Sequence, residues 1–108
     1  MQALKEGVEY VLNNFNSDQK QRIIFTEKVK GVFNKGTTNE EVVNMLIDRF
    51  YALQKKNFSA ENQCVILLLK NIRQLLAKRL TKKINQVNKL TNGQAEQQYI
   101  ETTNFDQR

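Results

Sequence analysis

The sequence contains no histidine, no proline and no tryptophan, and it has one cysteine and four glycines in 108 residues. Without histidine or a second cysteine, the commonest metal-binding sets cannot be assembled. The usual general base and the Cys–His and Ser–His–Asp nucleophiles are excluded as well. We therefore expect a protein that is not an enzyme, with no catalytic residue, no metal site and no cofactor.

Long apolar segments are also missing. The longest unbroken apolar run, CVILLL at 64–69, is far shorter than the roughly 20 residues that a membrane-spanning helix needs. The N-terminus, MQALKEGVEY, contains acidic residues and no continuous apolar core, so it does not resemble a secretory signal. Because Cys64 has no second cysteine to pair with, we expect a reducing compartment and a cytoplasmic protein.

Negative charge is absent from one long stretch of the chain. Residues 62–95 hold seven cations and no anion, whereas residues 1–61 hold nine cations and eight anions. The net charge of +6 therefore lies almost entirely on one segment. Five of its cations fall within LAKRLTKKINQVNKL, residues 76–90.

Apolar residues recur at the three-and-four spacing of a helix face in four segments, about 4–14, 18–35, 39–56 and 60–90. Short connections between consecutive helices make neighbouring helices antiparallel. The sequence therefore predicts an all-α fold: an antiparallel up-and-down four-helix bundle over residues 1–93, with a long fourth helix. Residues 94–108 are polar and lose the periodicity, and we expect them to form a flexible C-terminal tail.

Capping signals set the predicted helix ends. Ser17 and Ser59 are candidate N-caps, and Gly36 is a candidate C-terminal break. Thr38 and Glu41 match a capping box. The predicted core stripe of the fourth helix consists of Val65, Leu69, Ile72, Leu76, Leu80, Ile84 and Val87.

The basic half of the fourth helix is the candidate interaction surface. Solvated charge alone is one explanation, and contact with an anionic membrane surface is another. Interleaved aromatics or glycines for base stacking are lacking, so we expect no nucleic-acid partner. Apolar residues of the tail add candidate anchors. The predicted partner-binding residues are Lys78, Arg79, Lys82, Lys83, Lys89, Tyr99, Ile100 and Phe105.

Two short segments resemble a known family. FSAENQCVILLLKNI, residues 58–72, is similar to the F-[ST]-x-E start of the last helix in immunity proteins against pediocin-like (class IIa) bacteriocins. IETTNF, residues 100–105, resembles the Thr-Thr-Asn tail of some members, although the tail tryptophan of other members is absent.

The resemblance implies a cytosolic four-helix bundle that protects a cell from a bacteriocin. Such a protein would act at the inner face of the membrane-embedded mannose phosphotransferase permease with bound bacteriocin, and would block the leak. Specificity would lie in the C-terminal half. Cations near an anionic leaflet contribute about 1 kcal/mol each, which favours a peripheral position at the inner membrane face.

Two other functions stay open at this point. One is a small basic helical regulator that binds nucleic acid, and the other is an adaptor for a soluble protein. The sequence does not indicate which bacteriocin would be resisted or which oligomeric state the chain adopts.

Overall fold

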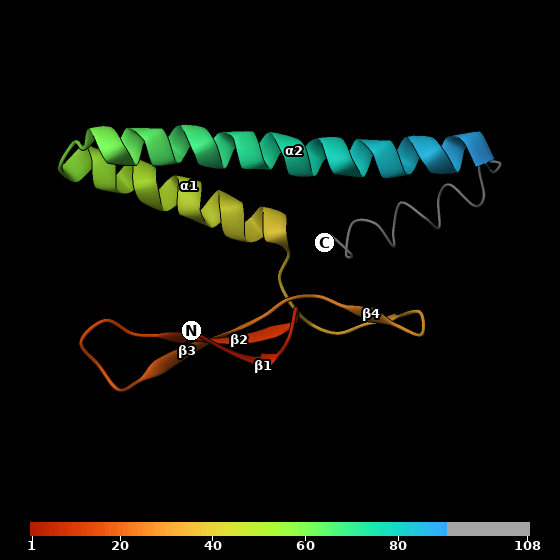
Figure 1. Cartoon of the computed structure of the whole chain (residues 1–108), viewed down its shortest axis with the longest axis horizontal. Helices are drawn as coiled ribbons and strands as arrows, with labels where there is room; N and C mark the ends of the chain where they lie inside the picture. Colours follow the sequence, from red (N-terminus) through yellow and green to blue (C-terminus); the bar gives the residue numbers. More distant parts are fainter. Residues whose placement is uncertain (91–108) are drawn as a thin grey trace.

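The computed structural model describes residues 1–90 of the chain, with the side chains of residues 1–86. These residues form a helical hairpin in one layer and short antiparallel strands in a second layer, joined by one linker (Figure 1). The elements follow in the order β1 Gln2–Lys5, β2 Glu9–Asn13, β3 Lys20–Ile24, β4 Lys28–Val29, β5 Val32–Phe33, α1 Asn39–Lys56 and α2 Ala60–Leu90.

The predicted all-α four-helix bundle is wrong, because residues 1–33 form five strands in two sheets instead of two helices. The apolar spacing that suggested helices rests on only a few residues per segment, and such short patterns fit strands equally well. The β-branched residues Ile23 and Ile24 in β3 favour a strand, as do Val29 in β4 and Val32 in β5. The long fourth helix of the prediction is present as α2.

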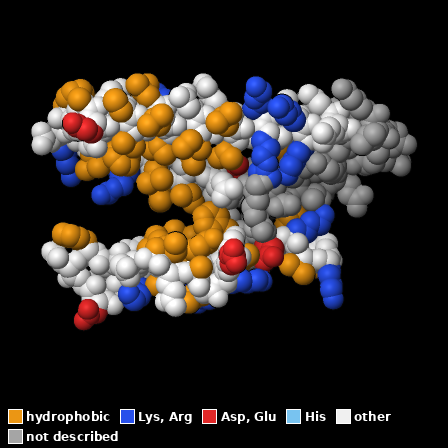
Figure 2. Space-filling model, in the orientation of Figure 1, with side chains coloured by type: hydrophobic (Ala, Val, Ile, Leu, Met, Phe, Trp, Pro, Cys, Tyr) orange, Lys and Arg blue, Asp and Glu red, His pale blue; other side chains and the backbone are white. Residues whose placement is uncertain are grey.

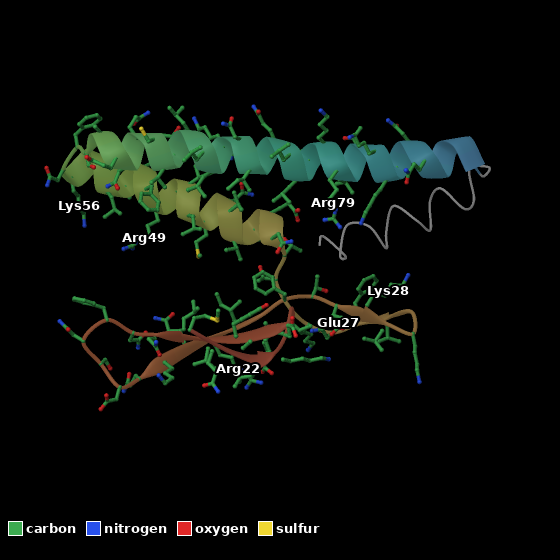
Figure 3. All side chains as sticks on the ribbon, viewed as in Figure 1. Arg22, Glu27, Lys28, Arg49, Lys56 and Arg79 are labelled. Carbon is green, nitrogen blue, oxygen red and sulfur yellow. The ribbon has the colours of Figure 1, made fainter. Side chains whose placement is uncertain are left out.

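The first sheet contains β1, β2 and β3 in that order, all antiparallel. Tyr10 of β2 lies opposite Ala3 of β1 and Ile23 of β3, so these three side chains share one face. Glu9 and Arg22 occupy the other face, where they form an ion pair. Arg22 lies on the side of the sheet turned away from the helices (Figure 3). The more apolar face is therefore the one turned toward the hairpin.

Two turns that the helical prediction missed create the strands. Lys30 and Gly31 join β4 to β5 with φ of 52° and 79°, and two central residues with positive φ are typical of a type I′ hairpin turn. Between β2 and β3, Ser17 accepts a hydrogen bond from the backbone N–H of Gln19 at 3.0 Å. Ser17 is thus a turn residue rather than a helix N-cap, since its hydroxyl offers the backbone a local alternative.

Gly36 holds the linker against Phe25 and Thr26, the two residues that follow β3, rather than ending a helix as predicted. A Cβ at this position would lie 2.6 Å from the backbone carbon of Phe25 and from the backbone nitrogen of Thr26. The close approach lets Thr37 donate to the carbonyl of Ile24 and accept from the N–H of Thr26, both at 2.8 Å. These bonds attach the start of the hairpin to the sheet.

The two helices begin at the caps that the sequence indicated. Thr38 accepts a hydrogen bond from the N–H of Glu41 at 3.2 Å, and Ser59 accepts one from the N–H of Asn62 at 3.2 Å. Gln54 donates to the carbonyl of Ser59 at 2.9 Å and accepts from its N–H at 2.8 Å. The tight turn between the helices is therefore closed by one side chain, and α1 and α2 run antiparallel.

The core of the described residues is small. Val8, Ile47 and Ile66 are its buried hydrophobic side chains, and Ile66 is only 1% exposed. Ile72, which we predicted in the core, is 43% exposed. A bundle would cover α2 from several sides, whereas α1 covers one narrow face of it. The other members of the predicted stripe whose side chains are described are half-buried, namely Val65, Leu69, Leu76, Leu80 and Ile84, and the most buried residue is Ile66, next to Val65.

We predict that Ile66→Ala lowers the free energy of unfolding by about 2–5 kcal/mol, because it leaves a cavity in this small core. Leu67→Ala is the matched control, since Leu67 is 54% exposed, and it should change stability by about 0.5 kcal/mol or less. Urea denaturation followed by far-UV circular dichroism measures both. Equal losses in the two variants would contradict the assigned core.

Candidate anion-binding site

Four cations gather on the half of α2 that extends past the start of α1 (Figure 1). Lys78, Arg79, Lys82 and Lys83 fall within two turns of this helix, at the spacing that places i, i+3 and i+4 side chains together. We call these four residues the basic cluster. Figure 2 shows Lys and Arg side chains gathered on this part of the helical layer.

The basic cluster lines a shallow groove of about 350 Å³. Leu75 and Gln86 complete its wall, one helical turn to either side of the cations. Lys78 and Lys82 are exposed, while Arg79 and Lys83 are half-buried. The groove thus offers several positive charges together with one apolar and one amide contact.

Helix formation does not explain the basic cluster. The favourable interaction of cations with a helix C-terminus fades within the last turn, and α2 continues to Leu90, seven residues after Lys83. Lys78 with Lys82, and Arg79 with Lys83, are like-charge i, i+4 pairs, each costing a helix roughly 0.2–0.5 kcal/mol. The basic cluster is therefore slightly unfavourable to the helix that carries it.

Glu40 is the acidic residue of α1 on which the charge of Arg79 acts. It lies in the first turn of α1, and neither of its carboxylate oxygens contacts solvent or has a hydrogen-bond partner among the described residues. Burial raises the pKa of Glu40 above its usual 4.5, while its backbone N–H and the charge of Arg79 partly oppose the rise. Arg79 lies on the side of α2 that faces the start of α1 (Figure 3).

The structure brings together four of the eight predicted partner-binding residues, namely the basic cluster. Lys89 belongs to α2, but its side chain lies outside the described part. Tyr99, Ile100 and Phe105, and the predicted tail as a whole, lie outside the described residues. Leu75 and Gln86 were missed as lining residues. Their positions, three residues before Lys78 and three after Lys83, could have indicated them.

Other chemistry is sparse in the described part of the chain. Residues 1–90 contain no group of three or more Cys, Asp or Glu side chains placed to hold a metal ion. Cys64 is an exposed free thiol on α2. Neither described helix is both long and apolar enough to cross a membrane.

Comparison with known proteins gave no match to any family model, curated protein or solved structure.

We predict a pH dependence that Glu40→Gln removes. Because the pKa of Glu40 is raised in the folded state, the fold favours the protonated form, and the stability linked to this residue falls as pH rises from 4.5 through the raised pKa. The free energy of unfolding of the wild type, minus that of Glu40→Gln, should therefore decrease with pH across this range. Urea denaturation at a series of pH values measures it.

Glu41→Gln serves as the control, because it removes one negative charge from the same first turn of α1. If the free energy of unfolding of the wild type, minus that of Glu40→Gln, increases with pH, the burial of the Glu40 carboxylate is contradicted.

Proposed function

We propose that this chain is a binding protein without catalytic activity, and that the groove on α2 binds a small ligand carrying two or more phosphate groups. The observation that carries the proposal is the groove itself: four cations line one space of about 350 Å³, on a segment that has no acidic residue from 62 to 90.

Phosphate is the anion that best fits the charges of the groove. Arg79 offers a planar fork that matches two oxygens of one phosphate, and the three lysines supply compact point charges around it. A single carboxylate would neutralise one cation and leave the others repelling one another. Two or more phosphates would neutralise most of the basic cluster.

The dimensions of the groove favour a small molecule over a nucleic acid. Its volume is at the lower end of the roughly 300–1,000 Å³ that is usual for small-ligand sites. The basic cluster spans only about 8 Å of helix axis, at about 1.5 Å per residue. Proteins that bind duplex DNA commonly neutralise about 6–10 phosphates along the strands, which needs a longer row of cations. Leu75 and Gln86 could contact the part of the ligand that carries no phosphate.

We predict that the full chain binds pyrophosphate, a nucleoside triphosphate or a dinucleotide in isothermal titration calorimetry, with affinity that falls as salt rises. Lys78→Glu with Lys83→Glu should weaken binding by about tenfold or more, because two attractive charges become repulsive. Lys55→Glu with Lys56→Glu is the matched control. It makes the same change in net charge in the last turn of α1, outside the groove.

Three outcomes would overturn this function. The first is no heat of binding for any of these probes at low salt. The second is equal weakening by the control pair, which would indicate net charge rather than a site. The third is binding confined to vesicles that contain phosphatidylserine, with none to the free phosphorylated probes, which would favour a membrane surface.

The bacteriocin immunity function is a second candidate, supported by the start of α2. Ser59 caps this helix and its hydroxyl donates to the carboxylate of Glu61 at 3.0 Å, so the segment that resembles the immunity proteins does begin a long helix. The four-helix bundle that the resemblance also implied is wrong for this chain. In this candidate the chain is cytoplasmic and binds the permease with its bacteriocin at the inner membrane face.

A killing assay tests this candidate. A sensitive lactic acid bacterium that expresses the chain should survive one or a few pediocin-like toxins. Charge reversal at Lys78, Lys82 and Lys89, or truncation after Gly93, should abolish that protection without lowering the amount of folded protein in the cell. Unchanged killing across a broad toxin panel, with expression verified, would exclude the immunity function.

A further inference from the structure

A row of exposed apolar residues runs along the side of α2 that is turned away from its contact with α1. Leu68, Ile72 and Leu75 are 62%, 43% and 65% exposed, and the exposed Cys64 precedes them. At about 100° per residue, Leu68 lies roughly 160° around the helix from the buried Ile66. We call Cys64, Leu68, Ile72 and Leu75 the apolar stripe. Figure 2 shows how much hydrophobic surface the helical layer exposes.

Charged residues extend the apolar stripe at both ends, with opposite sign. Glu61 precedes Cys64 by three residues, and Arg79 and Lys82 follow Leu75 by four and seven. From Glu61 the spacing toward the centre at Asn71 and Ile72 is three residues to Cys64, four to Leu68 and then three or four. From Lys82 it is three residues to Arg79, four to Leu75 and then three or four. The stripe is therefore nearly symmetric in position and complementary in charge.

We propose that two copies of this chain pair through the apolar stripe, with the two α2 helices antiparallel around a two-fold axis near residues 71 and 72. In this arrangement Leu68 of each copy lies opposite Leu75 of the other, and Glu61 lies opposite Lys82. The surface on a two-fold axis must be complementary to itself. When the second α2 runs antiparallel to the first, the acidic start of each stripe lies opposite the basic end of the other, which meets this condition.

Burial supplies the driving force for this pairing. A large aliphatic side chain gains about 1.5–3 kcal/mol when it is moved fully from water into an apolar contact, and each copy would contribute Leu68, Ile72 and Leu75. The core within the described residues is small, so the apolar surface left outside it is large for the chain. A second copy covers it with the same residues.

The apolar stripe with its basic end shares Leu75, Arg79 and Lys82 with the groove, so a second copy on the stripe would lie along one side of the basic cluster. The pairing would bring Phe58 of the second copy, which is 70% exposed in one chain, beside Asn85 and Gln86 at the edge of the basic cluster. Each groove would then gain an aromatic wall. Glu61 of the second copy would neutralise Lys82 and leave three cations for an anion.

Sedimentation velocity of the full chain tests the proposal, without ligand and at concentrations up to tens of micromolar. We expect a dimer. Leu68→Glu with Leu75→Glu should weaken association by about 100-fold or more and yield a monomer, because four apolar contacts are replaced by buried carboxylates. Leu67→Glu is the control: this leucine is 54% exposed but lies about 100° from Leu68 on the wheel, and the dimer should persist.

A charge exchange keeps the test valid even if the double glutamate variant fails to fold. Glu61→Lys alone and Lys82→Glu alone should each be monomeric, because both of their cross-pairs repel. A mixture of these two variants should restore a heterodimer, because both cross-pairs then attract. Circular dichroism of each variant confirms that α1 and α2 are intact.

Several results would overturn the dimer. One is a full chain that stays monomeric at the highest concentration, as it would if residues 91–108 of the same chain covered the stripe. Another is an assembly that Leu68→Glu with Leu75→Glu leaves intact. A third is a mixture of the charge variants that associates no better than either alone. None of these bears on calorimetric ligand binding, so this inference and the proposed function can fail separately.

Discussion

The contact between α1 and α2 is the interaction on which the rest of the structure depends. Ile47 and Ile66 provide its buried side chains, and the paired hydrogen bonds between Gln54 and Ser59 close the turn that makes the helices antiparallel. The sheet is attached to this hairpin through the linker at Gly36, where the absence of a Cβ permits close backbone approach. Because α1 is shorter than α2, the basic end of α2 is left free to form a groove.

The basic cluster and the exposed apolar surface of α2 are not explained by the fold of one chain. The like-charge pairs within the basic cluster oppose helix formation, and Leu68 and Leu75 remain exposed although the chain has few buried residues. A phosphorylated ligand in the groove would offset the repulsion between the cations. A second copy on the apolar stripe would remove the exposed leucines from water. Both features lie on one helix, so ligand affinity and association can influence each other.

The two halves of the chain differ in how far the local sequence determines their structure, and the reason is physical. Residues 39–90 carry caps at Thr38 and Ser59 and long periodic patterns, and local signals of this kind determine helices directly. Residues 1–33 contain strands of two to five residues, whose partners lie elsewhere in the chain. A few apolar residues per strand matched a helical spacing by chance, and the turn at Lys30–Gly31 was the signal that could have corrected it.

By itself, the sequence determined the composition of the candidate site: a helix over residues 60–90 with seven cations, five of them after residue 75, and no acid beyond Glu61. Charge segregation and helix caps are local properties of the chain. Only the tertiary structure decided that Ile66 rather than Ile72 is buried, that Leu75 and Gln86 join the cations in a groove, and that Gly36 lies against the segment just after β3. These outcomes depend on which element covers which face, and that is set by contacts between residues far apart in the sequence.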